Sequence, residues 1–177
     1  MVGIISSLGW SQGMVPWFKI KTEQDIPYRT VDAQVLKLNI AYPLGEGAFP
    51  ALVYIYHSWG WMFEGDRAYY LGELTRAARR GYVAVSFDFR NLSVMREGRS
   101  RNPFPAQLDD SKALIRWLRA NESKYQIDGS RIGALGFSGG GNLALLLGVQ
   151  SPDSKTPVTE DNSGFSVGYR LWSPWRE

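Results

Sequence analysis

The sequence predicts an α/β fold built on a doubly wound, mostly parallel sheet. Short, nearly all-apolar runs of β-forming residues alternate with segments whose apolar residues recur at helical spacing, from residue 51 to residue 148. Strands separated by helices are joined by right-handed crossovers, which place helices on both faces of a parallel sheet. Because the alternation stops near residue 150, we expect the C-terminal part of such a sheet to be missing from these residues.

The first expected strand covers residues 31–41, where polar and apolar residues roughly alternate before a turn signal at residues 43–47. Residues 51–56, ALVYIY, predict a strand buried on both faces. Apolar residues at helical spacing over 66–80 predict a helix that ends at Gly81, since glycine is a common C-terminal cap.

The second half of the pattern repeats this order. Residues 82–87, YVAVSF, predict another buried strand, and a long helix is expected to follow residues 102–105, Asn-Pro-Phe-Pro. Residues 131–137, RIGALGF, predict the next strand, and residues 139–148 predict the helix after it. The sequence therefore predicts three buried strands with a helix after each.

Composition excludes several classes of function. The 20 basic and 17 acidic residues are mixed along the chain, so nucleic acid is not an expected partner. No cysteine is present, which excludes disulfides, thiolate metal sites and a cysteine nucleophile. Serine and glycine interrupt the uncharged residues 1–18, and no run is long enough to span a membrane, so we predict a cytoplasmic protein.

The strongest motif is Gly-Phe-Ser-Gly-Gly at residues 136–140, between an expected strand and an expected helix. A G-x-S-x-G motif in that position is typical of a nucleophilic serine on a sharp turn, where the positions two before and two after the serine must be small. The helix that begins behind the serine favours developing negative charge. A glycine-rich phosphate turn and a plain tight turn are the alternatives.

A second motif, His-Ser-Trp-Gly-Trp at residues 57–61, directly follows the strand 51–56. It resembles the H-G-G-G-W oxyanion loop of the hormone-sensitive-lipase-like and bacterial feruloyl-esterase-like carboxylesterases of the α/β-hydrolase superfamily. Ser58 and Trp59 stand where that family has glycine. The similarity extends in order and spacing from about residue 25 to residue 148, through these further stretches: DIPY at 25–28, SFDFR at 86–90, FPAQLDD at 104–110 and IDGSRI at 127–132.

The resemblance implies a serine ester hydrolase acting on short-chain esters, with no metal or organic cofactor. It implies that Ser138 is the catalytic nucleophile, and that backbone N–H groups of Gly139, Trp59 and Gly60 form the oxyanion hole. The family's His57 equivalent anchors the oxyanion loop; an uninvolved, partly buried histidine and a catalytic one are the alternatives for His57.

The catalytic triad is incomplete in these residues. In this fold the acid and the histidine follow the nucleophile along the chain, but no histidine follows Ser138, and His57 is the single histidine of the sequence. Serine needs a base to take its proton, so we expect very slow ester hydrolysis or none. A catalytically inactive binding or interaction protein on the same fold is the alternative function.

Other polar and aromatic residues have mainly structural interpretations. Asp109 and Asp110 are expected to favour a helix N-terminus or to pair with arginine, and Asp128 and Arg131 to tie together the turn before the strand. Trp117 is expected in the core. An acyl-pocket role stays open for two further aromatic residues, Trp61 and Phe137.

We expect an N-terminal arm over residues 1–24, the N-terminal half of an α/β-hydrolase core over 25–150, and a divergent tail over 151–177. The tail is polar and turn-rich and shows no clear period, as in either a genuine short protein or a truncated or frame-shifted esterase. Because a later strand is expected beside residues 131–137, we predict an exposed sheet edge and, through it, a homo-oligomer.

Overall fold

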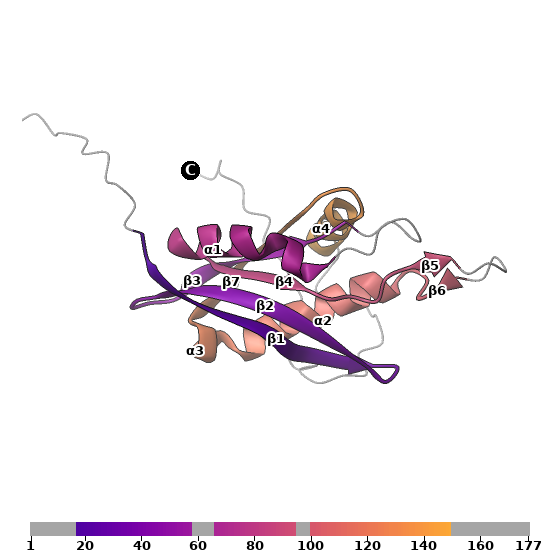
Figure 1. The fold of residues 1–177 in the computed structure, drawn as a ribbon, viewed down its shortest axis with the longest axis horizontal. Helices are drawn as coiled ribbons and strands as arrows, with labels where there is room; N and C mark the ends of the chain where they lie inside the picture. Colours follow the sequence, from indigo (N-terminus) through magenta and orange to yellow (C-terminus); the bar gives the residue numbers. More distant parts are fainter. Residues whose placement is uncertain (1–16, 58–65, 95–99, 150–177) are drawn as a thin grey trace, which may run out of the picture.

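A five-stranded mixed sheet forms the centre of the computed structural model, which describes residues 17–57, 66–94 and 100–149 (Figure 1). Its strands follow the spatial order β1-β2-β4-β3-β7. The strands of this sheet are β1 (Lys19–Val31), β2 (Gln34–Leu44), β3 (Phe49–Ile55), β4 (Val83–Phe87) and β7 (Ile127–Gly136). A separate two-stranded ladder consists of β5 (Ser93–Val94) and β6 (Ser100–Arg101).

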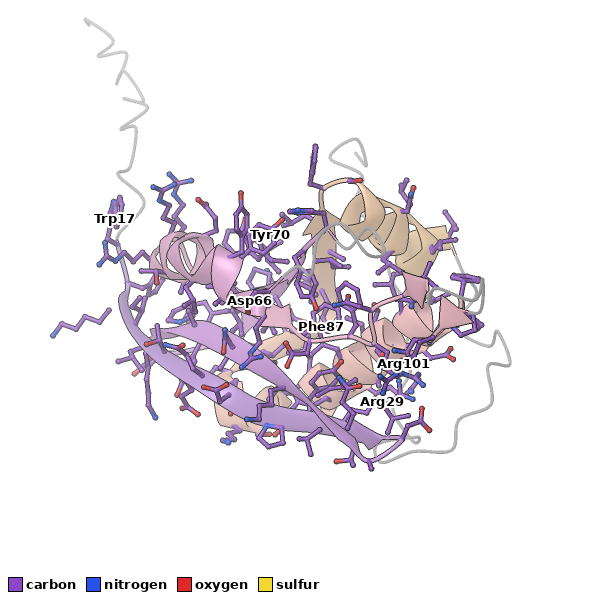
Figure 2. The ribbon with its side chains drawn as sticks, turned by 45° about the vertical axis from the view of Figure 1, so that its right-hand side comes forward. Trp17, Arg29, Asp66, Tyr70, Phe87 and Arg101 are labelled. Carbon is purple, nitrogen blue, oxygen red and sulfur yellow. The ribbon has the colours of Figure 1, made fainter. Side chains whose placement is uncertain are left out.

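Helices cover both faces of the sheet, as the sequence predicts. They are the short 3₁₀ helix η1 (Arg67–Tyr70), α1 (Leu71–Arg79), α2 (Ala106–Ala120), α3 (Glu122–Tyr125) and α4 (Gly139–Val149). Figure 1 shows α1 on one side of the sheet, with α2 and α3 on the other. Tyr70 lies beside α1 and Arg29 beside α2 (Figure 2).

The α/β fold class is confirmed, and the parallel part of the sheet consists of β4, β3 and β7. Strand β2 pairs antiparallel with β4 on one side and with β1 on the other. The apolar runs behave as buried strands: Val53 and Ile55 in β3, and Val83 and Val85 in β4, are fully buried. The sheet is thus antiparallel on the β1 side and parallel on the β7 side.

Strand β1 was not predicted, and the expected strand over residues 31–41 is the second arm of a hairpin. The chain turns at Asp32 and Ala33, whose φ angles are +49° and +60°. Two-residue hairpin turns with two positive φ angles usually carry Asn-Gly or Asp-Gly, so Asp-Ala gave no signal. Strand β1 begins at Lys19, before the expected core boundary at residue 25, while residues 1–16 lie outside the described part of the chain.

Helix α1 packs against β2 and β4 and ends at Arg79, just before the predicted cap Gly81, which adopts φ +89°. Helix α2 lies against the other face, where Leu114 and Leu118 are fully buried. Trp117 is also part of this core, which confirms the packing prediction for that residue. Helix α4 packs against β7, β3 and α2, so it shares the α2 face of the sheet.

A buried ion network connects the β1 side of the sheet to α2. The carboxylate of Asp110 in α2 is fully buried and accepts a hydrogen bond from Arg29 Nη1 on β1. It also accepts from the backbone N–H of Arg90 at 2.7 Å and from Arg90 Nε at 3.0 Å. Burial raises the pKa of Asp110, and the hydrogen bonds from Arg90 offset part of that rise. The predicted pairing of Asp110 with arginine is confirmed.

Candidate active site

Ser138 lies on the sharp turn between β7 and α4 and is exposed. Its φ angle is +53°, in the left-handed region that costs a residue with a side chain roughly 1–2 kcal/mol. The turn is closed by a hydrogen bond from the backbone N–H of Gly140 to the carbonyl of Phe137, at 3.0 Å. A strained serine that is held exposed by a closed turn is the geometry that the G-x-S-x-G motif predicts.

The glycines on either side of Ser138 are required by close backbone packing. A Cβ atom on Gly136 would lie 2.5 Å from the carbonyl carbon of Gly140 and 2.7 Å from the carbonyl oxygen of Ile55. A Cβ atom on Gly140 would lie 2.2 Å from the same Ile55 oxygen. The start of α4 therefore crosses the end of β3 at backbone contact, and this crossing fixes the position of Ser138 relative to β3.

Gly139 is the first residue of α4, so its backbone N–H belongs to the helix N-terminus. The first N–H groups of a helix have no partner within the helix and carry partial positive charge. Asn142 donates its backbone N–H to the carbonyl of Ser138 at 3.1 Å, which places Ser138 directly at the helix start. This arrangement can stabilise an oxyanion that forms on a carbonyl attacked by Ser138.

The other two predicted oxyanion residues, Trp59 and Gly60, and the aromatic candidate Trp61 lie outside the described residues. The chain on either side of them is described. Strand β3 pairs with β7 so that Ile55 is opposite Gly136, and β3 therefore ends beside the serine turn. On the far side, Asp66 caps η1 by accepting the backbone N–H of Ala68 at 2.8 Å.

Arg67 fixes the chain where it re-enters the described structure. Its Nη1 atom donates to both carboxylate oxygens of Asp88, at 2.8 and 2.7 Å, and its Nη2 donates to Asp25. Its Nε donates to Asn39 at 3.3 Å, while its carbonyl accepts from the buried Ser86 hydroxyl at 2.8 Å. The entry to η1 is thereby tied to β1, β2 and β4. Arg67 was not predicted as a functional residue, because an arginine among well-mixed charges gives no sequence signal without its partners.

His57 lies beside the serine turn, with its ring 6.4 Å from the ring of Phe137 and 6.4 Å from that of Tyr69. Both contacts are edge-to-face. Phe137 is 74% exposed, and the acyl-pocket role considered for it stays a prediction. The structural and catalytic roles considered for His57 both stay predictions.

The expected contact between Asp128 and Arg131 is present, but the prediction that they lie in a turn before the strand is wrong, because β7 begins at Ile127 and contains both residues. Asp128 accepts from Arg131 Nε at 2.6 Å and from the backbone N–H of Ser130 at 3.0 Å. Among the described residues, no group of three or more histidine, cysteine, aspartate or glutamate side chains is placed to hold a metal ion. No helix in that part of the chain is long and apolar enough to cross a membrane.

Comparison with known proteins agrees with this geometry. The sequence model of the BD-FAE family matches residues 38–167. Carboxylesterase NlhH of Mycobacterium tuberculosis (strain ATCC 25618 / H37Rv) is 30% identical over 133 residues, which are 75% of this chain and 36% of the relative. Neutral cholesterol ester hydrolase 1 of Bos taurus is 34% identical over 56% of this chain and 24% of its own length.

Solved structures with the same arrangement include a butyrate-bound thermophilic esterase, Est2, of Thermogutta terrifontis. It superposes with a TM-score of 0.66 at 28% identity, over 88% of this chain and 52% of the esterase. The same esterase phosphorylated by paraoxon superposes with a TM-score of 0.62 at 29% identity, over 83% of this chain and 52% of the esterase. The chain thus spans about half the length of these esterases and about a third of NlhH.

Proposed function

This chain belongs to the BD-FAE family of α/β-hydrolase esterases, and we propose from that membership that it attacks short-chain carboxylic esters through Ser138. The observation that carries the proposal is the conformation of Ser138. Ser138 is exposed and held at φ +53° at the start of α4, between Gly136 and Gly140, two positions that leave no room for a side chain. Backbone strain of this kind lowers stability and is found mainly at functional sites, so it supports a role for the Ser138 hydroxyl.

In the proposed reaction Ser138 Oγ attacks the ester carbonyl carbon, and the carbonyl oxygen becomes an oxyanion beside the N–H of Gly139. Trp59 and Gly60 supply further N–H donors in this proposal, and each well-placed donor is worth roughly 3–4 kcal/mol in the transition state. The alcohol then leaves, and water hydrolyses the acyl-serine. No step needs a metal or an organic cofactor.

The present 177 residues supply no evident base to accept the hydroxyl proton of Ser138. No histidine follows Ser138, and we propose that His57 anchors the oxyanion segment rather than acting as the base. The serine proton must then pass to solvent, so only the residual rate that comes from binding and the oxyanion hole is expected. The same observation favours the second candidate, a catalytically inactive binding protein on an esterase fold. The cytoplasmic location also stays a prediction.

Paraoxon is a suitable test because the similar Thermogutta esterase is phosphorylated by it. We expect prolonged incubation to add one diethylphosphoryl group to the wild-type chain, measured by intact-mass spectrometry, and none to Ser138→Ala. Ser130→Ala, which removes an exposed serine from β7, is the matched control and should be labelled like the wild type. Absence of labelling, or equal labelling of Ser138→Ala, would favour the binding protein.

A second measurement separates the two roles of His57. If His57 is structural, His57→Asn should lower the free energy of unfolding by about 1–3 kcal/mol and leave labelling of Ser138 intact. If His57→Asn instead keeps the stability of the wild type and abolishes labelling, His57 is the base and the proposed anchoring role is wrong.

A further inference from the structure

Tyr69 lies close to the serine turn, although it belongs to neither of the two sequence motifs. Its ring centre is 6.4 Å from that of His57, and the two ring planes are at 88°. On the other side, the ring of Phe137 lies at the same distance from His57, with the planes at 83°. Both contacts have the distance and angle of edge-to-face aromatic pairs. Three segments that are far apart along the chain thus meet at the imidazole ring of His57.

The short helix η1, which carries Tyr69, is fixed by contacts that do not involve His57. The ring of Tyr70 lies 5.3 Å from that of Tyr54 on β3 and 5.1 Å from that of Tyr69. At the start of η1, Arg67 Nη1 donates to both carboxylate oxygens of Asp88. The backbone of Tyr69 is therefore anchored to β3 through its neighbour Tyr70 and to the end of β4 through Arg67. Its ring contacts His57 from a fixed position.

We propose that Tyr69 is a positioning residue, whose ring, together with that of Phe137, sets the orientation of the His57 imidazole beside Ser138. The functional consequence rests on the proposed ester reaction of Ser138. His57 directly follows β3 and directly precedes the segment that holds the proposed oxyanion donors. The anchoring role and the catalytic role considered for His57 both require one fixed orientation of its ring. A small misplacement of a reacting or orienting group lowers a rate by a large factor.

Two substitutions of Tyr69 separate the ring from the hydroxyl group. Tyr69→Phe keeps the ring and therefore both of its aromatic contacts, whereas Tyr69→Leu removes the ring and keeps an apolar side chain. Tyr82→Leu is the matched control, because Tyr82 is also an exposed tyrosine. It lies just before the start of β4, which is parallel to β3, so it is at the opposite end of these strands from His57.

Nuclear magnetic resonance of the full chain measures the placement of His57 directly. His57 is the single histidine of the 177 residues, so its imidazole C–H signals are unique in the spectrum. The ring current of Tyr69 acts on these protons, and we expect Tyr69→Leu to change their chemical shifts. Tyr69→Phe and Tyr82→Leu should leave the shifts as in the wild type. Unchanged shifts in Tyr69→Leu, or an equal change in Tyr82→Leu, would overturn the proposal whether or not Ser138 reacts with an ester.

The rate of Ser138 labelling by paraoxon measures the consequence for the site. Tyr69→Leu should slow labelling about tenfold or more, while Tyr69→Phe should keep the wild-type rate. Thermal unfolding checks that both variants are folded, and little change is expected because Tyr69 is 73% exposed. An unchanged rate in Tyr69→Leu, or equal slowing in both variants, would overturn the positioning role. If the wild type is not labelled at all, the proposed function fails, and the chemical shifts of His57 alone support or overturn its placement by Tyr69.

Discussion

The two edges of the sheet, β1 and β7, differ in nearly every feature that governs strand pairing. Strand β1 is charged along its length, has a proline at residue 27 and breaks register with β2 twice, between Glu23 and Ile26 and between Pro27 and Arg29. Strand β7 pairs in regular register from Ile132 to Gly136 and has no charge there. Charges, proline and bulges are the usual protection of a terminal strand. By this criterion β1 has the sequence of an outer strand and β7 that of an inner one.

The difference extends to how each edge is anchored. The β1 side is locked to α2 through the buried carboxylate of Asp110, and to η1 through Arg67 and Asp25. The β7 side is held by backbone packing at Gly136 and Gly140 and by apolar contacts with α4. Polar interactions thus define one side of the sheet, and close packing of small residues defines the other.

The largest expected effect is the difference in the free energy of unfolding between two variants, each of which lacks one carboxylate, on the β1 side or on the β7 side. Asp110→Ala leaves Arg29 and Arg90 buried without their shared partner, so we expect a loss of about 3–5 kcal/mol in the free energy of unfolding. Asp128→Ala, which breaks a partly exposed pair with Arg131, should cost less than about 1 kcal/mol. Urea denaturation followed by circular dichroism measures both. Equal losses would show that the two sides are not anchored differently.

A methyl group added to a glycine tests the close packing on the β7 side. Gly140→Ala places Cβ against the carbonyl oxygen of Ile55, which is backbone and cannot rotate away, so we expect a loss of about 1–3 kcal/mol or more. Gly72→Ala in α1 is the control, because a Cβ there meets nothing within 4 Å and should stabilise the helix by up to about 1 kcal/mol. Thermal unfolding of both variants is the measurement. A neutral Gly140→Ala would mean that the turn at Ser138 is not fixed by this contact.

The smallest expected effect is the dependence of the free energy of unfolding on pH that comes from Glu23 in β1. The hydrogen bonds from Lys21 and then Tyr42 hold the pKa of Glu23 below its usual value. Their contribution to stability is therefore present above the usual glutamate pKa and is lost as pH falls through the lowered value, between about pH 5 and pH 3. Glu23→Gln should show a shallower fall of the unfolding free energy over this range. An unchanged slope would place the acid sensitivity elsewhere, for example at Asp128, whose pKa is lowered by the hydrogen bonds from Ser130 and Arg131.

The parts of the fold that were predicted correctly are those with a strong local signal. Buried strands show as apolar runs, and a glycine with positive φ follows the end of α1, so β3, β4 and the end of α1 followed from pattern alone. The helix predicted over 66–80 is instead the 3₁₀ helix η1 followed by α1 from Leu71. Strand β1 was missed because its apolar residues are few and its hairpin turns through Asp32 and Ala33. Three elements, α3, β5 and β6, have only two to four residues each, too few to show a helical or strand period in the sequence.

For the candidate site, the sequence by itself determined the residue types and their order: a serine with glycine two positions before and two positions after it, between a strand and a helix, and no histidine later in the sequence. Only the tertiary structure decided what lies against that serine. The carbonyl oxygen of Ile55 leaves no room for a side chain at Gly140. The carbonyl and guanidinium groups of Arg67 form hydrogen bonds with residues on β1 and β2 and with residues in and just after β4, at the start of η1. These contacts join residues far apart along the chain, and a local pattern contains no information about which backbone atoms will meet.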